Sequence, residues 1–177
     1  KQHGISDEKL INDMCFTVGI EPYIVKNAEN KSGGAQYIFK NQTHQMWFKI
    51  YKDSIRLYDV LMNFDKRYPI TTGQIQFWTA EMWSVLWNMW YWGYRTEITD
   101  VLNFCWATDH IDMCDTHPIL HMAGVTDNQK TTLFYKGDFI NQNPLELLND
   151  DIGYFDYVKK TSTGIKYINE MKKLIQK

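Results

Sequence analysis

The sequence predicts an α/β or α+β fold in which a mixed sheet is flanked by helices. Two segments, 43–64 and 79–92, carry apolar side chains at three- and four-residue steps, as amphipathic helices do. Between them and after them lie shorter segments that alternate or run apolar over strand-like lengths. Because 177 residues with 44% hydrophobic content are enough for one packed core, we expect a single domain over 1–177 with helices and strands intermingled.

The N-terminal elements follow from local signals. "ISDEKLINDMCF" predicts a short helix with Ser6 as its N-cap. "PYIVKNAENKSGGAQYIFK" predicts two short strands around a glycine-rich loop. A long helix is expected to begin at Thr43, which can cap it, and to end at Phe64 before "RYPITTGQ" breaks the pattern. The helix over 79–92 should end at Gly93 and should bury one face, formed by Trp83, Leu86, Trp87 and Trp90.

The C-terminal elements are predicted to be mostly strands. "RTEIT", "LNFCWA", "PILHMAG" and "TTLFYKG" each have strand length and strand-like patterning. The tail over 161–177 predicts an exposed amphipathic helix with a lysine-rich outer face.

Composition excludes several classes of protein. A net charge of −2 favours neither nucleic-acid binding nor a basic membrane patch. No run of 18 apolar residues predicts a membrane span, and the three cysteines lack the spacing of a disulfide framework or zinc knuckle. No signal peptide is visible, so we expect a cytoplasmic protein, although two N-x-S/T sequons leave a secretory or virion-associated location open. The 7 Trp and 11 Tyr predict a large aromatic core, and the remaining rings could face a sugar.

A glycine pair precedes one of the predicted strands. In "GGAQY", Gly33 and Gly34 would let the backbone approach a ligand, and Gln36 could hydrogen-bond a sugar or base edge. A plain hairpin turn explains the same residues.

A carboxylate lies at the predicted start of the 79–92 helix. Glu81 falls in the first turn, where the helix dipole favours its charge, and Trp78 precedes it. It could serve as a general base for an incoming hydroxyl or merely stabilise the helix start.

Acidic residues and histidines crowd the segment 109–121. Carboxylate oxygens and imidazoles are ligands for hard divalent ions. Their spacing does not place a full set on one face, so the cluster is expected to contribute a single ligand to a site completed elsewhere. The cluster contains Asp109, His110, Asp112, Asp115, His117 and His121.

Two ionisable side chains, which are costly to bury, lie at strand-like apolar runs and close to glycines. His121 precedes Gly124, and Lys136 precedes Gly137. An imidazole can complete a divalent metal shell, a lysine neutralises phosphate oxygens, and glycine admits backbone amides close to an anion. Together they predict a site for a metal-bound diphosphate, with a core histidine and a solvated lysine as the alternative.

The ordered blocks "GGAQYIFK", "WTAEMWSVLWNMW", "FCWATD", "ILHMAGV" and "FYKGDF" resemble the C-terminal, acceptor-side half of GT-A type nucleotide-sugar glycosyltransferases over residues 32–139. The resemblance implies that His121 binds Mn²⁺ or Mg²⁺ and that Lys136 holds the diphosphate, although the gap between them is longer than usual. It also implies Glu81 as the base, with Asp109 as the next candidate, and Trp78 and Trp106 as acceptor-side rings.

Two features of that family are missing from these 177 residues: the D-x-D motif and the βαβ nucleotide-binding half. The resemblance therefore implies an upstream half that completes the metal site. The leading hypothesis is transfer of a sugar from a nucleotide diphosphate sugar to a hydroxyl acceptor, as a hexosyltransferase. The alternative is a non-catalytic module that binds carbohydrate or protein, and a structural scaffold or virion protein is a third class.

Overall fold

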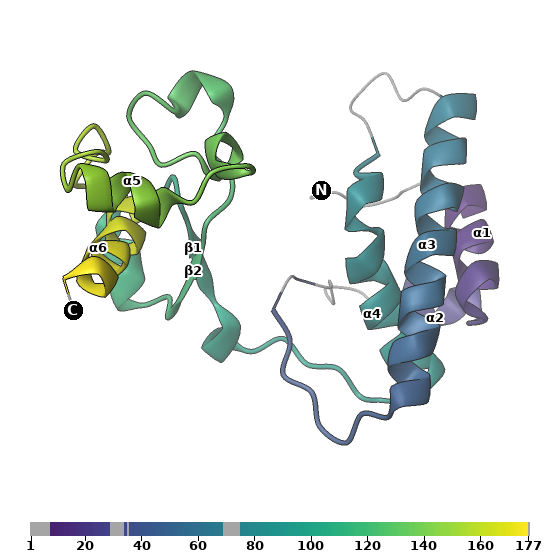
Figure 1. Ribbon diagram of the computed structural model, residues 1–177. Helices are drawn as coiled ribbons and strands as arrows, with labels where there is room; N and C mark the ends of the chain where they lie inside the picture. The colour runs from purple at the N-terminus through teal and green to yellow at the C-terminus, as the bar shows by residue number, and fades with distance from the viewer. Residues whose placement is uncertain (1–7, 29–33, 35, 69–74, 177) are drawn as a thin grey trace. The chain divides into compact units, whose positions relative to one another are not determined.

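The computed structural model describes residues 8–28, 34, 36–68 and 75–176. The chain divides into two compact units, 1–98 and 99–177 (Figure 1), where the sequence predicts one domain. Each unit gathers a hydrophobic core of its own, which is why contacts cluster within the units. The α-helices are α1 (Glu8–Val18), α2 (Pro22–Asn27), α3 (His44–Arg67), α4 (Ala80–Tyr91), α5 (Pro144–Asp150) and α6 (Gly164–Ile175), and the strands are β1 (Phe104–Trp106) and β2 (Ile119–His121).

The first unit is helical, and its longest element is α3 with 24 residues. Helices α1 and α4 both pack against α3 (Figure 1). Leu10 and Met14 of α1, Leu57 and Leu61 of α3, and Trp87 of α4 are all at most 1% exposed and share one core. The apolar periodicity of the sequence thus marks the faces along which these helices meet.

The predicted helix boundaries are largely confirmed. The Thr43 hydroxyl accepts a hydrogen bond from the backbone N–H of Met46 at 3.4 Å and so caps α3. Thr79 occupies the N-cap position of α4, but its hydroxyl donates to the carbonyl of Gln76 at 2.7 Å instead of capping. Gly93 follows α4 with a φ of 74°, a conformation that ends helices readily at glycine.

The two strands predicted between Pro22 and Lys40 are wrong where the structure describes them. Residues 22–27 form α2, because Pro22 at the first turn presets the helical φ. Residues 36–40 hold no strand. There the Tyr37 and Phe39 rings stack 5.3 Å apart, and Phe39 meets the edge of Trp47 on α3 at 5.2 Å. The segment is therefore held by ring contacts rather than by a strand partner.

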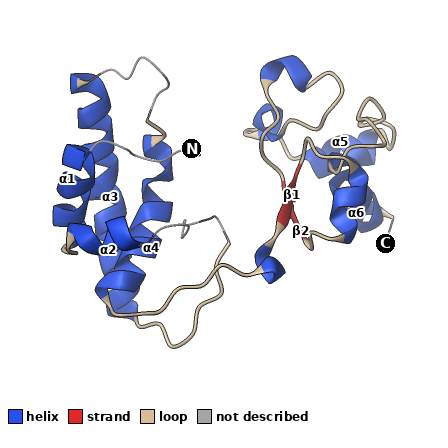
Figure 2. Ribbon diagram, turned by 180° about the vertical axis from the view of Figure 1, so that it is seen from behind, coloured by secondary structure: helices blue, strands red, loops and turns tan. Residues whose placement is uncertain are grey.

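The second unit contains a two-stranded parallel sheet (Figure 2). Phe104 pairs with Ile119, and Trp106 pairs with His121, in the predicted "LNFCWA" and "PILHMAG" segments. The other two predicted strands are wrong: residues 95–99 are irregular, and "TTLFYKG" forms turns that lead into a 3-10 helix, Lys136–Phe139. These elements make the fold a helix-rich mixture with a small sheet, as an α/β or α+β class requires.

Aromatic packing explains the lost fourth strand. The Phe134 and Phe139 rings stack 5.2 Å apart, and both contact Phe155. The chain must fold back to bring them together, so it cannot remain extended between them. These rings join a core closed by α5 and α6.

The predicted C-terminal helix is present as α6, three residues shorter at its start. The helix is amphipathic as expected. Its apolar face buries Ile168 and Met171 in the core, whereas Leu174 is exposed. The residues before α6 hydrogen-bond to the loop that follows β1. Thr163 donates its backbone N–H to the Asp109 carbonyl at 2.9 Å.

Candidate functional site

The ends of β1 and β2 carry the ring cluster that best fits a ligand site. Trp106 and His121 are the last residues of two parallel strands, and their ring centroids lie 4.9 Å apart at 90°. Phe104 lies 5.0 Å from His121, and Trp106 remains 42% exposed. In α/β proteins, ligands bind outside the carboxyl ends of parallel strands. We call Phe104, Trp106, His121 and Gly124 the strand-end cluster.

His121 is half-buried, and two influences favour its neutral form. Burial lowers the pKa of His121 from its ordinary 6.5, and the nearby positive charge of Lys136 lowers this pKa further. Lys136 itself is exposed, at the first position of its 3-10 helix. At neutral pH, His121 therefore offers a neutral imidazole within the field of a cation.

Both glycines near these residues make room for an aromatic ring. Gly124 has a φ of +86°, and a Cβ there would lie 3.4 Å from Cε3 of Trp106. At Gly137, a Cβ would come within 2.5 Å of the Tyr135 ring. Ring packing within the protein thus explains both glycines, whereas the sequence predicts them to contact a donor.

Asp109 is engaged with the backbone. Its Oδ2 accepts a hydrogen bond from the Trp106 N–H at 2.8 Å, which closes the turn after β1. The Thr163 hydroxyl donates to the Trp106 carbonyl on the same turn. These bonds place Trp106, so the geometry fits Asp109 as a positioning residue better than as the base.

The remaining members of the predicted acidic and histidine cluster are spread over separate contacts. His110 Nδ1 lies 3.1 Å from Asp112 Oδ2, and Asp115 lies 3.9 Å from the Lys166 ammonium. Among the described residues, no group of three His, Cys, Asp or Glu side chains could hold a metal ion. Within the described part of the chain, His121 therefore does not belong to a three-ligand metal site.

The predicted base and the second predicted ring lie in the first unit. Glu81 is exposed in the first turn of α4, and Trp78 is 56% exposed just before it. The predicted burial of the helix stripe is confirmed for Leu86 and Trp87, whereas Trp83 and Trp90 are only partly buried against the same core. Glu81 and His121 therefore belong to different units.

The glycine-rich segment is described only in part. Gly33 lies outside the described residues, and Gly34 and Gln36 are half-buried. Next to them, the Tyr37 hydroxyl donates to the Met82 carbonyl at 3.3 Å, in the first turn of α4. Burial, and then the charge of Glu81, raise the pKa of Tyr37 to about 12. The segment thus approaches Glu81, which the sequence alone does not indicate.

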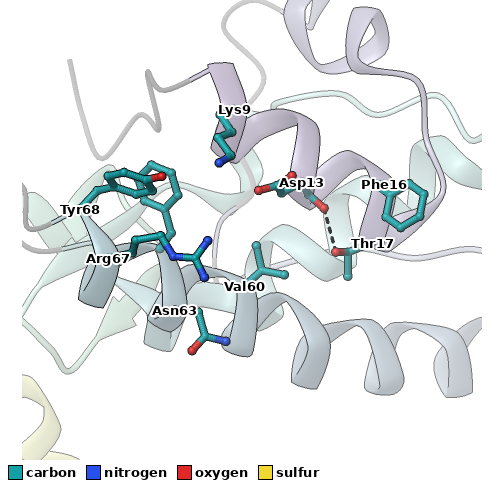
Figure 3. A pocket seen from close by; sticks show the side chains of 9 residues that line it. Lys9, Asp13, Phe16, Thr17, Val60, Asn63, Arg67 and Tyr68 are labelled. Atoms are coloured by element: carbon teal, nitrogen blue, oxygen red, sulfur yellow. Dashed lines mark hydrogen bonds between the residues drawn. The ribbon is translucent and has the colours of Figure 1, made fainter.

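Two hollows open on the first unit, and neither is lined by a predicted site residue. The first, of about 310 Å³, lies between α1 and α3, where Lys9 and Asp13 face Asn63 and Arg67 (Figure 3). The second, of about 470 Å³, lies over the N-terminal half of α3 and reaches Tyr91. The charged residues that line both hollows lie on polar faces of helices, and the helical pattern of the sequence does not predict a hollow there.

A buried charge below the second hollow also escaped prediction. Asp53 of α3 is 1% exposed, and its carboxylate accepts hydrogen bonds from Lys49 at 2.5 Å and from the Asn88 amide at 3.0 Å. Lys49 also donates to the Val18 carbonyl at 2.7 Å and lies 4.2 Å over the Tyr91 ring. Asp53 lies between Ile50 and Leu57 at helical spacing, on the apolar face of α3. This position in the sequence could have predicted that the carboxylate is buried.

Comparison with protein-family models, with curated proteins and with solved structures gives no match for this chain. No described helix is both long and apolar enough to cross a bilayer. The site must therefore be judged on its own chemistry.

Proposed function

We propose that this chain takes part in the transfer of a sugar from a nucleotide diphosphate sugar to a hydroxyl acceptor, as the acceptor-side part of a hexosyltransferase. One observation carries the proposal. A neutral imidazole and an exposed indole meet at the carboxyl ends of two parallel strands, and the charge of Lys136 acts on that imidazole. Ligand sites often combine such a position with a titratable group whose pKa is shifted.

The roles follow from the charges that sugar transfer creates. The acceptor hydroxyl oxygen attacks the anomeric carbon as the bond to the phosphate oxygen breaks, and the diphosphate leaves with the bonding electrons. The Lys136 ammonium would stabilise the charge on that leaving group, and Trp106 would offer the sugar a flat apolar face. By the resemblance, Glu81 would accept the hydroxyl proton.

The divalent ion of this family fits the described residues only partially. With no three-donor group among them, His121 would supply one nitrogen to Mn²⁺ or Mg²⁺, and residues outside the described chain would supply the others. The roles of Lys136 and Trp106 do not depend on that ion.

Calorimetric titration with uridine and guanosine diphosphates, with and without Mn²⁺, tests the proposal. We expect at least one of them to bind, and Lys136→Ala to weaken that binding about tenfold or more, because a hydrogen bond to a charged group contributes about 1.5–3 kcal/mol. His121→Ala should weaken binding as well. Lys173→Ala is the matched control, since Lys173 is an exposed lysine of the same unit that pairs with Glu170 on α6.

Two outcomes contradict the proposal. One is a chain that binds neither diphosphate, and the other is binding that Lys136→Ala and Lys173→Ala weaken equally. Trp78 and Trp106, at 56% and 42% exposure, favour a second function as a non-catalytic carbohydrate-binding module. That function predicts oligosaccharide binding that Trp106→Ala abolishes, without any diphosphate binding.

A further inference from the structure

Two cysteines of the second unit lie side by side although they are nine positions apart in the sequence. The sulfurs of Cys105 and Cys114 are 3.4 Å apart. A disulfide bond is about 2.0 Å long, so the two atoms need to approach by only ~1.4 Å to bond. Their spacing carries no disulfide signature, and it is the return of the chain beside β1 that brings them together.

The two thiols differ in their access to solvent. Cys105 is the central residue of β1 and is 0% exposed, with its sulfur 3.6 Å from the Ile119 carbonyl. Burial, followed by the hydrogen bond with Cys114, raises the pKa of Cys105 to about 11. Cys114 is half-buried in a short 3-10 helix, Ile111–Asp115, beside the exposed Met113. A small reagent can therefore reach Cys114 before Cys105.

We propose that Cys105 and Cys114 form a dithiol site that small-molecule disulfides of the glutathione type oxidise to an intramolecular disulfide. Cys114 loses its proton, and its thiolate attacks the small disulfide and releases one thiol. The Cys105 sulfur then attacks the Cys114 sulfur of the mixed disulfide, loses its proton and releases the second thiol. The two cysteines are oxidised, the small disulfide is reduced to two thiols, and both protons end on those thiols.

The bond would tie the 3-10 helix to β1 at the residue before Trp106. Trp106 belongs to the strand-end cluster, so oxidation would fix the backbone on one side of that cluster. The inference rests on the sulfur geometry alone and stands whether or not the chain binds nucleotide sugars.

Peptide mapping by mass spectrometry tests the proposal on the whole chain. The protein is incubated with oxidised glutathione, its free thiols are blocked with N-ethylmaleimide under denaturing conditions, and it is digested without reductant. We expect loss of two of the three free thiols and a cross-linked peptide pair containing Cys105 and Cys114. Cys15, which is 0% exposed in the first unit, should remain free and serves as the internal control.

Variants separate the two steps. In Cys105→Ser, Cys114 should accumulate as a mixed disulfide with glutathione, because its resolving partner is gone. In Cys114→Ser, Cys105 should stay unmodified, and Cys15→Ser should cross-link like the wild type. If Cys105→Ser does not fold, the wild-type map decides alone. A wild-type protein that keeps three free thiols, or holds glutathione on Cys114 without cross-linking, overturns the proposal.

Discussion

The protonation of His121 depends on its immediate surroundings. At the end of β2 the imidazole contacts the rings of Phe104 and Trp106, which also contact each other, and partial burial disfavours its charged form. The positive charge of Lys136 acts in the same direction. A neutral imidazole can accept a hydrogen bond or donate one, whereas a protonated imidazole only donates. Whether His121 can accept a hydrogen bond from a ligand therefore depends on its burial beside Phe104 and Trp106 and on the charge of Lys136.

This arrangement predicts the pH at which His121 titrates. NMR titration of the histidine ring protons should give His121 a pKa below 6.5. Because the folded-state pKa is lowered, the His121 contribution to stability is present above pH 6.5 and is lost as the pH falls through the folded pKa. Lys136→Ala should raise this pKa, but not fully to 6.5, because the burial remains. Lys130→Ala, at a lysine paired with Asp127 and Asp138, should leave it unchanged, and an equal rise in both variants would exclude a specific effect of Lys136.

Single residues differ in how well the sequence predicts them. The burial of Leu86 and Trp87 follows from helical periodicity, which indicates the side of a helix on which each residue lies. The contact between Cys105 and Cys114 and the hydrogen bond from the Thr163 hydroxyl to the Trp106 carbonyl depend on how separate segments meet. Periodicity carries no information on such meetings.

At the scale of elements, helices were predicted better than strands. The two long periodic segments form α3 and α4. In each of them, many apolar side chains fall on the same face of the helix, so the pattern is unambiguous. Short apolar runs fit a strand, a turn or a helix segment equally well, and length alone cannot decide between them. In "TTLFYKG", the stacking of Phe134 on Phe139 outweighed strand propensity. Among the described residues, only β1 and β2 pair as strands.

Helix α3 carries a buried ion pair that can be tested by substitution. Lys49→Met removes the closest cation from Asp53, whose side chain is 2% exposed. Leaving a buried charge without its partner costs about 3–5 kcal/mol. We expect a loss in the free energy of unfolding near the lower end of that range, because Arg56 remains 3.7 Å from the carboxylate. Urea denaturation followed by circular dichroism measures it.

Two further variants make this result specific. Lys52→Met, at an exposed lysine of the same helix that lies over the Phe48 ring, should change stability by about 0.5 kcal/mol or less. The double variant Lys49→Met with Asp53→Asn should recover part of the loss, since no unpaired charge is left. A double variant that is less stable than Lys49→Met would show that the carboxylate stabilises the helix without Lys49.

At the scale of the whole molecule, each unit closes its own core. Leu61 is fully buried among helices of the first unit, and Phe155 is fully buried among the rings of the second. This division was not predictable, since no linker or change of composition marks residues 98 and 99. The predicted site was similarly divided: His121 and Lys136 belong to one unit and Glu81 to the other.

Separate cores predict separate responses to core substitutions. Leu61→Ala should cost about 2–5 kcal/mol and Phe155→Ala about 3–5 kcal/mol. Hydrogen exchange measured by mass spectrometry should show lost protection only in 1–98 for the first variant and only in 99–177 for the second. Wild-type protein is the reference. Equal loss across both ranges in either variant would mean that the units unfold as one.

The hydrogen bond between Thr163 and the Trp106 carbonyl has a consequence for biosynthesis. It joins residues 57 positions apart, so the turn after β1 cannot be completed until Thr163 has left the ribosome. The core of the first unit, by contrast, uses residues within 1–98 and can form during elongation. Until α6 has emerged as well, Phe134 and Phe155 lack the Ile168 and Met171 side of their core and stay exposed on the nascent chain. In this interval a chaperone has the most apolar surface to bind.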